Sequence, residues 1–422
     1  MKPWRSMLLW VMALSLVAVS LAGCGDSQDS VPTVEDPLVI SAALDLDVVE
    51  PLLEAFRDAY PEIPLSFIDR STLEVDRSVV AGTASVDPVA ESQPGGAEWR
   101  AEWRAEWRAE TPDVVISSAM PWQMDRANQG LAQRLQGPEV DSWPAWARWR
   151  DEVFAFTFEP VVMAYRLDLS RHMLPPQSHG DLHRLLATEA ERLSGRVTTY
   201  SPLDSGVGYT LAQQDARYSS RFWDLVAAMG AVDTQLEAST RDMLRGLSDG
   251  RYWLAYNLLG SYAMVYAQEH PEVIVQVPMD YSLVLMRLAF VHRHARHPQA
   301  AATFVKFLLS RAGQHVLAGQ TPLFSIRPDV TGPYTAARLR SQVGERLYPI
   351  LPKASLLAFV DPLRRQEFID RWEARFGDSA GKADIEAPSE IEAPSEIKGE
   401  TAGAKASIDT GSLSTQGDSR YR

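Results

Sequence analysis

The sequence predicts an α/β fold divided between two lobes. Short β-branched runs alternate with segments whose apolar residues recur at helical spacing, the pattern of a mostly parallel sheet covered by helices on both faces. Residues 37–376 are enough chain for two lobes of ordinary size, and an apolar content of 45% lets each lobe bury a core. Ligands bind at the carboxyl ends of the strands in such sheets, so residues just after strands are the candidate site.

The first lobe is expected to contain three strands separated by helices. We predict strands over 37–43, 65–68 and 113–117, and helices over 47–60 and 124–135. The segments that follow the strands, 43–45, 69–72 and 117–120, are small or polar. We interpret Asp45 and Asp47 as capping residues of the first helix rather than as a catalytic carboxylate pair.

The second lobe is expected to begin after the extended segment 158–165. Ser178 and Asp181 form a capping box that predicts a helix ending near Leu193. A strand over 196–200 then leads to the glycine-containing turn 201–209. The helix that starts there, at Ser205, is either an anion site built from unpaired amides or a capped turn without a ligand, and both interpretations stay open.

The N-terminus predicts a lipoprotein signal peptide over residues 1–23. Lys2 and Arg5 precede an uncharged apolar run that ends in Leu-Ala-Gly before Cys24. We expect cleavage before Cys24, acylation of that cysteine with diacylglycerol and a fatty acid such as palmitate, and a flexible tether over 24–36. The protein is then anchored in the cell envelope, facing the periplasm or the exterior. An ordinary cleaved signal with a chance cysteine is the alternative.

Composition excludes several classes of function. Cys24 is the only cysteine, so disulfides, thiolate catalysis and cysteine-based zinc sites are excluded. The net charge of −14 argues against nucleic-acid binding. No hydrolase, zinc-protease or P-loop motif is present, and we expect neither enzyme activity nor a cofactor. We interpret the pair His179 and His183, and the group His292, His294 and His297, as solvated loop histidines rather than metal ligands.

Two low-complexity segments stand apart from the predicted lobes. Residues 82–110 contain a tandem AEWR repeat, which we interpret as an insertion in the first lobe rather than an aromatic binding platform. Residues 377–422, with a second repeat, are poor in apolar residues and are expected to be disordered.

Five segments together resemble the extracellular solute-binding proteins of ABC importers. The similarity is to the branch that holds ferric-iron-binding proteins and the periplasmic phosphoglycerate transport regulatory protein. It implies a two-lobed periplasmic-binding-protein fold of type 2, with lobe 1 over 37–158 and 286–376 and lobe 2 over 159–285. Hinge strands are implied at 159–165 and 278–285. The segments are LVISAALDLDVVEPLLEAF, PDVVISSAMPWQ, SPLDSGVGY, WLAYNLLGSYA and VPMDYSLVLMRLAFV.

The resemblance also implies which residues line the cleft between the lobes. The family's adjacent tyrosines, which bind ferric iron, correspond to Leu258 and Leu259, so a ferric function is not expected. The implied ligand-binding residues are Asp45, Ser71, Thr72, Ser117, Ser118, Ser205, Gly206, Val207, Gly208, Asn257, Ser261 and Tyr281.

Hydroxyls, amides and helix starts suit a carboxylate or phosphate. The sequence therefore predicts a monomeric, lipid-anchored protein that captures a small anionic metabolite, a carboxylate or a phosphorylated acid, and delivers it to an ABC permease. The alternative is a periplasmic regulatory protein that reports the ligand to a membrane sensor kinase.

Overall fold

The computed structural model describes residues 36–81 and 111–377. All of them belong to one compact unit. The lipidation site Cys24, the AEWR repeat and the tail after residue 377 lie outside the described residues. Within the described part of the chain, no helix has the length and apolar character needed to cross a membrane.

The first lobe is built on a six-stranded sheet with the strand order β2-β1-β3-β12-β5-β4 in the described residues. Strand β1 pairs in parallel with β2 and with β3, as predicted, whereas β12 runs antiparallel to β3 because the chain enters it on return from the second lobe. The sheet, which we expected to be mostly parallel, is therefore mixed. The strands are β1 (Leu38–Ala42), β2 (Leu65–Asp69), β3 (Val114–Ser117), β4 (Arg148–Trp149), β5 (Val153–Ala155) and β12 (Leu288–Val291).

Helices cover this first sheet, and their starting points follow the strands. The expected helix over 124–135 is wrong in its bounds: α5 begins at Met120, directly after β3, and ends at Asn128 before a glycine of positive φ, Gly130. The helices of this lobe are α2 (Leu46–Ala59), α3 (Thr72–Ala81), α5 (Met120–Asn128), α6 (Pro138–Asp141), α13 (Pro298–Leu309), α14 (Arg311–Gln320) and α15 (Ala336–Val343).

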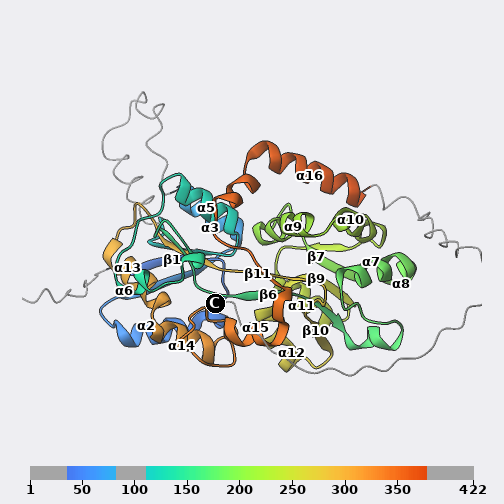
Figure 1. The fold of residues 1–422 in the computed structure, drawn as a ribbon, viewed down its shortest axis with the longest axis horizontal. Helices are drawn as coiled ribbons and strands as arrows, with labels where there is room; N and C mark the ends of the chain where they lie inside the picture. The colour runs from blue at the N-terminus through green and yellow to red at the C-terminus, as the bar shows by residue number, and fades with distance from the viewer. Residues whose placement is uncertain (1–35, 82–110, 378–422) are drawn as a thin grey trace, which may run out of the picture. The chain divides into compact units, whose positions relative to one another are not determined.

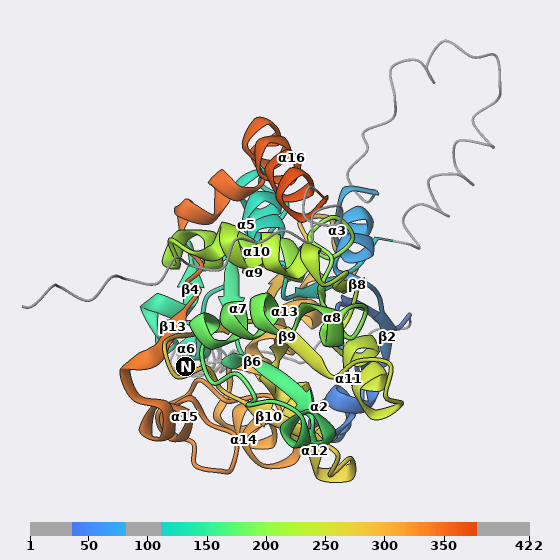
Figure 2. The same ribbon diagram turned by 90° about the vertical axis from the view of Figure 1, so that its right-hand side faces the viewer.

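The second lobe contains a sheet with the strand order β13-β11-β6-β9-β7-β8, in which β10 also pairs with β6. Helices α9 and α10 lie on one face of this sheet, and α11 and α12 on the other (Figures 1 and 2). The strands are β6 (Glu159–Arg166), β7 (Val197–Tyr200), β8 (Gln235–Glu237), β9 (Leu254–Leu259), β10 (Val273–Gln276), β11 (Ser282–Leu285) and β13 (Leu347–Pro349).

The helices of the second lobe start largely where the sequence placed them. Ser178 accepts a hydrogen bond from the amide of Asp181, so the predicted capping box is confirmed, but the helix breaks at Glu189 instead of running on to Leu193. Ser205 caps α9, as expected. The helices are α7 (His179–Thr188), α8 (Ala190–Leu193), α9 (Gly206–Tyr218), α10 (Phe222–Ala231), α11 (Thr240–Ser248), α12 (Gly260–Glu269) and α16 (Pro362–Gly377).

The C-terminal helix lies with the second lobe. Phe368, Ile369 and Trp372 of α16 are buried in the same apolar cluster as Phe222 of α10. This differs from the expected assignment of residues 286–376 to the first lobe, because the apolar face of α16 finds its partner on α10. The preceding 3₁₀ segment, Ala354–Phe359, packs on α5 of the first lobe, so the end of the described chain contacts both lobes.

Two antiparallel strands, β6 and β11, connect the lobes (Figure 1). A buried ion pair lies where they meet: Arg287, just after β11, has its Nε 3.0 Å from Oε1 of Glu159, the first residue of β6, and both side chains are 2% exposed. Thr157 Oγ1 donates to Glu159 Oε1 (2.8 Å) and accepts from the Arg287 amide (2.9 Å). Arg287 also donates to the carbonyl of Ala43 in the first lobe. One buried charge pair thus joins the hinge to the end of β1.

We expect Glu159→Gln to lower the free energy of unfolding by about 3–5 kcal/mol, because it leaves the Arg287 guanidinium buried without its counter-ion. Urea denaturation measures the loss. Asp329→Asn is the matched control: Asp329 pairs with Arg327 at the surface with its side chain 46% exposed, so this change should cost about 1 kcal/mol or less. Equal losses in the two variants would contradict the role of burial.

Candidate functional site

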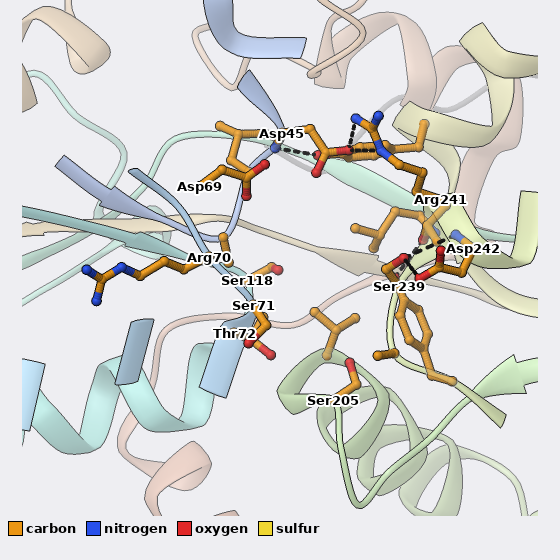
Figure 3. A pocket seen from close by; sticks show the side chains of 18 of the residues that line it. Asp45, Asp69, Arg70, Ser71, Thr72, Ser118, Ser205, Ser239, Arg241 and Asp242 are labelled. Carbon is orange, nitrogen blue, oxygen red and sulfur yellow. Dashed lines mark hydrogen bonds and ion pairs between the residues drawn. The ribbon is translucent and has the colours of Figure 1, made fainter. Parts of the chain in front are cut away.

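A cavity of about 330 Å³ lies between the two lobes, at the ends of β1, β2, β3, β7 and β8 (Figure 3). Its position agrees with the rule that ligands bind at the carboxyl ends of strands. The lining residues are Ala43, Leu44, Asp45, Asp69, Arg70, Ser71, Thr72, Ser118, Tyr200, Asp204, Ser205, Val207, Ala238, Ser239, Thr240, Arg241, Asp242, Leu259, Tyr262 and Arg287.

Helix N-termini from both lobes converge on this cavity. Helices α2, α3 and α5 begin beside it in the first lobe, and α9 and α11 begin beside it in the second. Each presents the positive end of its dipole and first amides without partners inside the helix, although the amides of Glu74, Gly208 and Asp242 are engaged by capping serines. These partial charges favour an anion near the helix starts, while the lining also includes the carboxylates of Asp45, Asp69, Asp204 and Asp242.

An ion-pair latch closes one side of the cavity. Arg241 at the start of α11 donates to Oδ2 of Asp45 (Nε, 2.9 Å) and to Oδ1 of Asp47 (2.9 Å), across the gap between the lobes. We expected these two carboxylates to cap α2, and this expectation is wrong for Asp45: it occupies the N-cap position but makes no capping hydrogen bond. Both carboxylates instead hold the arginine of the opposite lobe.

Two further contacts join the lobes around the cavity. The amide of Gly206 donates to Thr72 Oγ1 at 3.0 Å, and the amide of Asp45 donates to the hydroxyl of Tyr262 at 3.3 Å. A Cβ built on Gly206 would lie only 2.7 Å from Cβ of Ala119 in the first lobe. The lobes are therefore closed on the cavity, and glycine at position 206 permits their close approach.

Burial shifts the protonation equilibria of several lining groups. The pKa of Asp69 is raised to about 6, first by burial and then by the neighbouring Asp45 carboxylate, against the opposing influence of Arg241 and Arg287. Burial also raises the pKa of Tyr200 to about 12 and raises that of Tyr262. Both phenols are thus neutral hydrogen-bonding groups at physiological pH.

The structure brings half of the expected ligand-binding residues together at the cavity. Asp45, Ser71, Thr72, Ser118, Ser205 and Val207 all line it. Three others adjoin it without lining it. Ser117 is buried and its Oγ accepts from the amide of Ala119. Gly206 contributes the lobe contact described above, and Gly208 packs against Tyr200 with its amide donating to Ser205 Oγ.

The remaining expected residues lie elsewhere. Asn257 and Tyr281 both donate to the buried carboxylate of Asp215, at 2.7 Å and 2.9 Å, in the interior of the second lobe. Ser261 donates to Glu159 and so belongs to the hinge ion pair. None of the three lines the cavity, because each already has a buried acidic partner.

The histidines that we expected to be solvated are partly buried. His292 is fully buried, with Nε2 3.2 Å from the carbonyl of Val79, and burial lowers its pKa to about 4. His179 is 8% exposed, pairs with Asp280 at 2.9 Å and stacks on Tyr281. The interpretation as loop histidines is therefore wrong for these two. In the described ranges, no group of three histidine, cysteine or acidic side chains is placed to hold a metal ion.

Asp69, the last residue of β2, belongs to the segment 69–72 that was expected at the site because it follows a predicted strand. Other lining residues were not predicted. Ser239 caps α11, which begins with Thr240 and Arg241; a serine followed three residues later by Asp242 is a capping signature by which this helix start could have been found. Arg287 carried no local signal, because its role depends on the hinge.

We expect Gly206→Ala to hold the lobes apart. A methyl group at this position requires a shift of the opposing backbone at a cost of about 1–3 kcal/mol, which lowers the ratio of closed to open molecules by about fivefold or more. Small-angle X-ray scattering should show a larger radius of gyration. Gly180→Ala is the control, since a Cβ there meets only Ser178 Oγ, at 3.8 Å. Scattering identical to that of the parent protein would contradict the close approach.

The comparisons with known proteins agree on one family. The family described as "Bacterial extracellular solute-binding protein" matches residues 89–320. The substrate-binding protein of an ABC transporter from Agrobacterium tumefaciens shares 30% sequence identity, with a TM-score of 0.72 over 81% of this chain and 96% of that chain. A comparison with curated protein sequences gave no match.

More distant structures share the fold alone. AfuA from Actinobacillus pleuropneumoniae, solved with fructose-6-phosphate bound, is 15% identical with a TM-score of 0.60 over 81% of this chain and 99% of that chain. Iron-bound HitA from Pseudomonas aeruginosa is 16% identical with a TM-score of 0.58 over 80% of this chain and 99% of that chain.

These matches confirm the two-lobed type 2 binding-protein fold and the resemblance found in the sequence. The family and its structural neighbours are binding proteins of ABC transporters, not enzymes. They act in the periplasm or outside the cell, where they bind small ligands and deliver them to a membrane permease. The chain belongs to the bacterial extracellular solute-binding proteins.

Proposed function

We propose that this protein captures a small anionic metabolite, a carboxylate or a phosphorylated acid, in the cavity between its lobes and delivers it to an ABC permease while anchored to a membrane through Cys24. The observation that carries the proposal is the convergence of five helix N-termini from both lobes on one cavity. A bound anion interacts with the positive ends of helices in both lobes at once, so it stabilises the closed arrangement.

The hydroxyl groups of the lining strengthen this proposal. Ser71, Thr72, Ser118 and Ser205 lie on one side of the cavity, at the starts of α3, α5 and α9 (Figure 3). Hydroxyls and backbone amides can replace the water around a phosphate or carboxylate without adding a full positive charge. The structural neighbour AfuA was solved with a phosphorylated sugar, which is one member of the proposed ligand class.

Ferric iron fits this cavity poorly. A hard trivalent cation prefers oxygen ligands that carry charge, and the two lining tyrosines, Tyr200 and Tyr262, have raised pKa values that disfavour the phenolate. Leu259 occupies a lining position where the family's iron binders are expected to carry a tyrosine. We therefore extend the proposal to anions and not to ferric ion.

A thermal-shift screen of the full mature protein tests the ligand class. The ligands screened are carboxylates, phosphorylated acids, phosphonates, sugars and ferric ion. Binding stabilises the folded state by about 2.7 kcal/mol at a hundredfold excess over the dissociation constant, so an anion should raise the melting temperature. Stabilisation by uncharged sugars or ferric ion alone would refute the anionic class.

For the ligand found, we expect Ser118→Ala to weaken binding by about 1–3 kcal/mol, because a hydrogen bond to a charged group is lost in a closed cavity. Isothermal titration calorimetry measures the change. Ser117→Ala is the matched comparison: its hydroxyl serves the turn before α5, so its replacement should lower stability more than affinity. Unchanged affinity in Ser118→Ala would place the ligand elsewhere.

The anchor is tested independently of the ligand. We expect Cys24→Ala to move the protein from the membrane fraction to the soluble fraction of cells, because several acyl chains are lost together. The melting temperature of the released protein should equal that of the parent domain. Continued sedimentation with membranes after a salt wash would contradict lipidation.

Signalling to a membrane sensor kinase would use the same closed lobes as transport. A measurement of ligand uptake by cells distinguishes the two functions. Loss of ligand uptake on deletion of this protein supports delivery to a permease. Unchanged uptake with loss of a transcriptional response would support the sensing alternative.

A further inference from the structure

Asp69 differs from the other acidic residues of the cavity. It is the last residue of β2, paired in register with Ala42 of β1, and its side chain is directed into the space between the lobes (Figure 3). Among the described residues, its carboxylate makes no hydrogen bond and no ion pair. Asp204 and Asp242, by contrast, each accept a hydrogen bond from a nearby serine hydroxyl, at 2.8 Å and 2.7 Å.

The positive charges near Asp69 are already engaged by other residues. Arg241 is shared between Asp45 and Asp47, and Arg287 is paired with the buried Glu159. Figure 3 shows the side chain of Arg70 extending away from Asp69 and from the cavity. The side of the cavity that carries Asp69 therefore has an excess of negative charge and a hydrogen-bond acceptor without a donor.

The two sides of the cavity thus have opposite preferences. Ser71, Thr72, Ser118 and Ser205 lie together where the helices begin, while Asp69 lies next to Asp45 on the other side (Figure 3). An anionic group is favoured at the helix starts and repelled at Asp69. A hydroxyl or an ammonium has the reverse preference, because a carboxylate is an acceptor for either donor.

We propose that Asp69 selects ligands that carry a hydrogen-bond donor, a hydroxyl or an ammonium, at the end opposite their anionic group. This inference rests on the proposed function, since the helix starts must hold the anion for Asp69 to meet the other end. Asp69 is exposed in the closed structure, so an anion with an apolar tail displaces water from its carboxylate without offering a hydrogen bond in return, and such a ligand loses affinity.

The proposal is tested with probes that have the same carbon chain and differ in the group at one end. The phosphate set is propyl phosphate, 3-hydroxypropyl phosphate and 3-aminopropyl phosphate; the carboxylate set is butyrate, 4-hydroxybutyrate and 4-aminobutyrate. Titration calorimetry with the full mature protein should give at least one donor-bearing probe that binds about tenfold or more tightly than its apolar counterpart. Comparison of the hydroxyl and amino probes identifies which donor Asp69 prefers.

Variants assign that preference to Asp69. Asp69→Ala should bring the affinities within each set to near equality without weakening the apolar probe, and Asp69→Asn should remove most of any preference for the ammonium. Asp58→Asn, an exposed position on α2 away from the cavity, makes the same change in net charge and should preserve the preference. Melting temperatures of the empty variants show whether each is folded.

Measuring the probe affinities at a series of pH values provides a further test. The pKa of Asp69 is about 6 in the empty cavity, where the charged groups around it are Asp45, Asp47, Arg241 and Arg287. Because the ionised carboxylate is the better acceptor, the preference for 4-hydroxybutyrate over butyrate should increase as the pH rises through 6. A preference that increases as the pH falls would mean that protonated Asp69 donates to the ligand hydroxyl, and would overturn the proposal.

The remaining outcomes separate this inference from the proposed function. Equal binding of all three members of a set by the parent protein overturns the role of Asp69 and leaves the anionic class standing. A donor preference that survives in Asp69→Ala also overturns it. Failure of every phosphate and carboxylate to bind, with another ligand class found in the screen, overturns both.

Discussion

The closed arrangement depends on a charge pair buried at the hinge. Glu159 opens β6 and Arg287 follows β11, so the pair forms where the two connecting strands meet. Burying two charges is costly, and the cost is offset only when other hydrogen bonds complete the pair. Thr157, Ser261 and the carbonyl of Ala43 supply them, and Ala43 itself lines the cavity. The hinge and the floor of the cavity are consequently one polar network.

The ion-pair latch formed by Arg241 differs from the hinge pair in its exposure to solvent. Arg241 is 46% exposed where it meets Asp45 and Asp47, and exposed pairs of this kind contribute about 0–1 kcal/mol. Such a latch can orient the lobes but can hold them closed only weakly. A ligand that binds helix starts in both lobes then supplies the differential affinity that a two-state equilibrium requires. We infer that the buried pair holds the lobes together at the hinge, and that the proposed ligand would stabilise their closed arrangement.

Site residues whose position depends on local chain geometry could be predicted from the sequence. The strand ends after β1, β2 and β3, and the capped start of α9 at Ser205, are local features, and they predicted half of the residues that now line or adjoin the cavity. Sequence reasoning failed where a side chain has a partner far away in sequence. Asn257 and Tyr281 are polar and lie in family-like segments, yet Asp215 holds both in the interior of the second lobe.

The same limit explains the residues that were missed or misinterpreted. Asp45 precedes a helix and so was expected to cap it, but Arg241, 196 positions later, binds its carboxylate. Arg287 is an isolated charge in an apolar strand region, and only the pairing of β6 with β11 reveals its partner. The position of α16 likewise depended on an apolar face whose partner, α10, cannot be identified from periodicity alone.

The distribution of charge in the cavity also suggests how a ligand is released. Arg241 and Arg287 are paired with protein carboxylates, so the proposed anion would depend mainly on hydroxyls and helix amides. Those of α3 and α5 belong to the first lobe and those of α9 and α11 to the second. When the lobes separate, the contact between Thr72 and Gly206 breaks, and a ligand held by both lobes would keep only the partners of one lobe. Water then replaces the rest, so opening the hinge is enough to lower affinity, and no change of protonation is required for release.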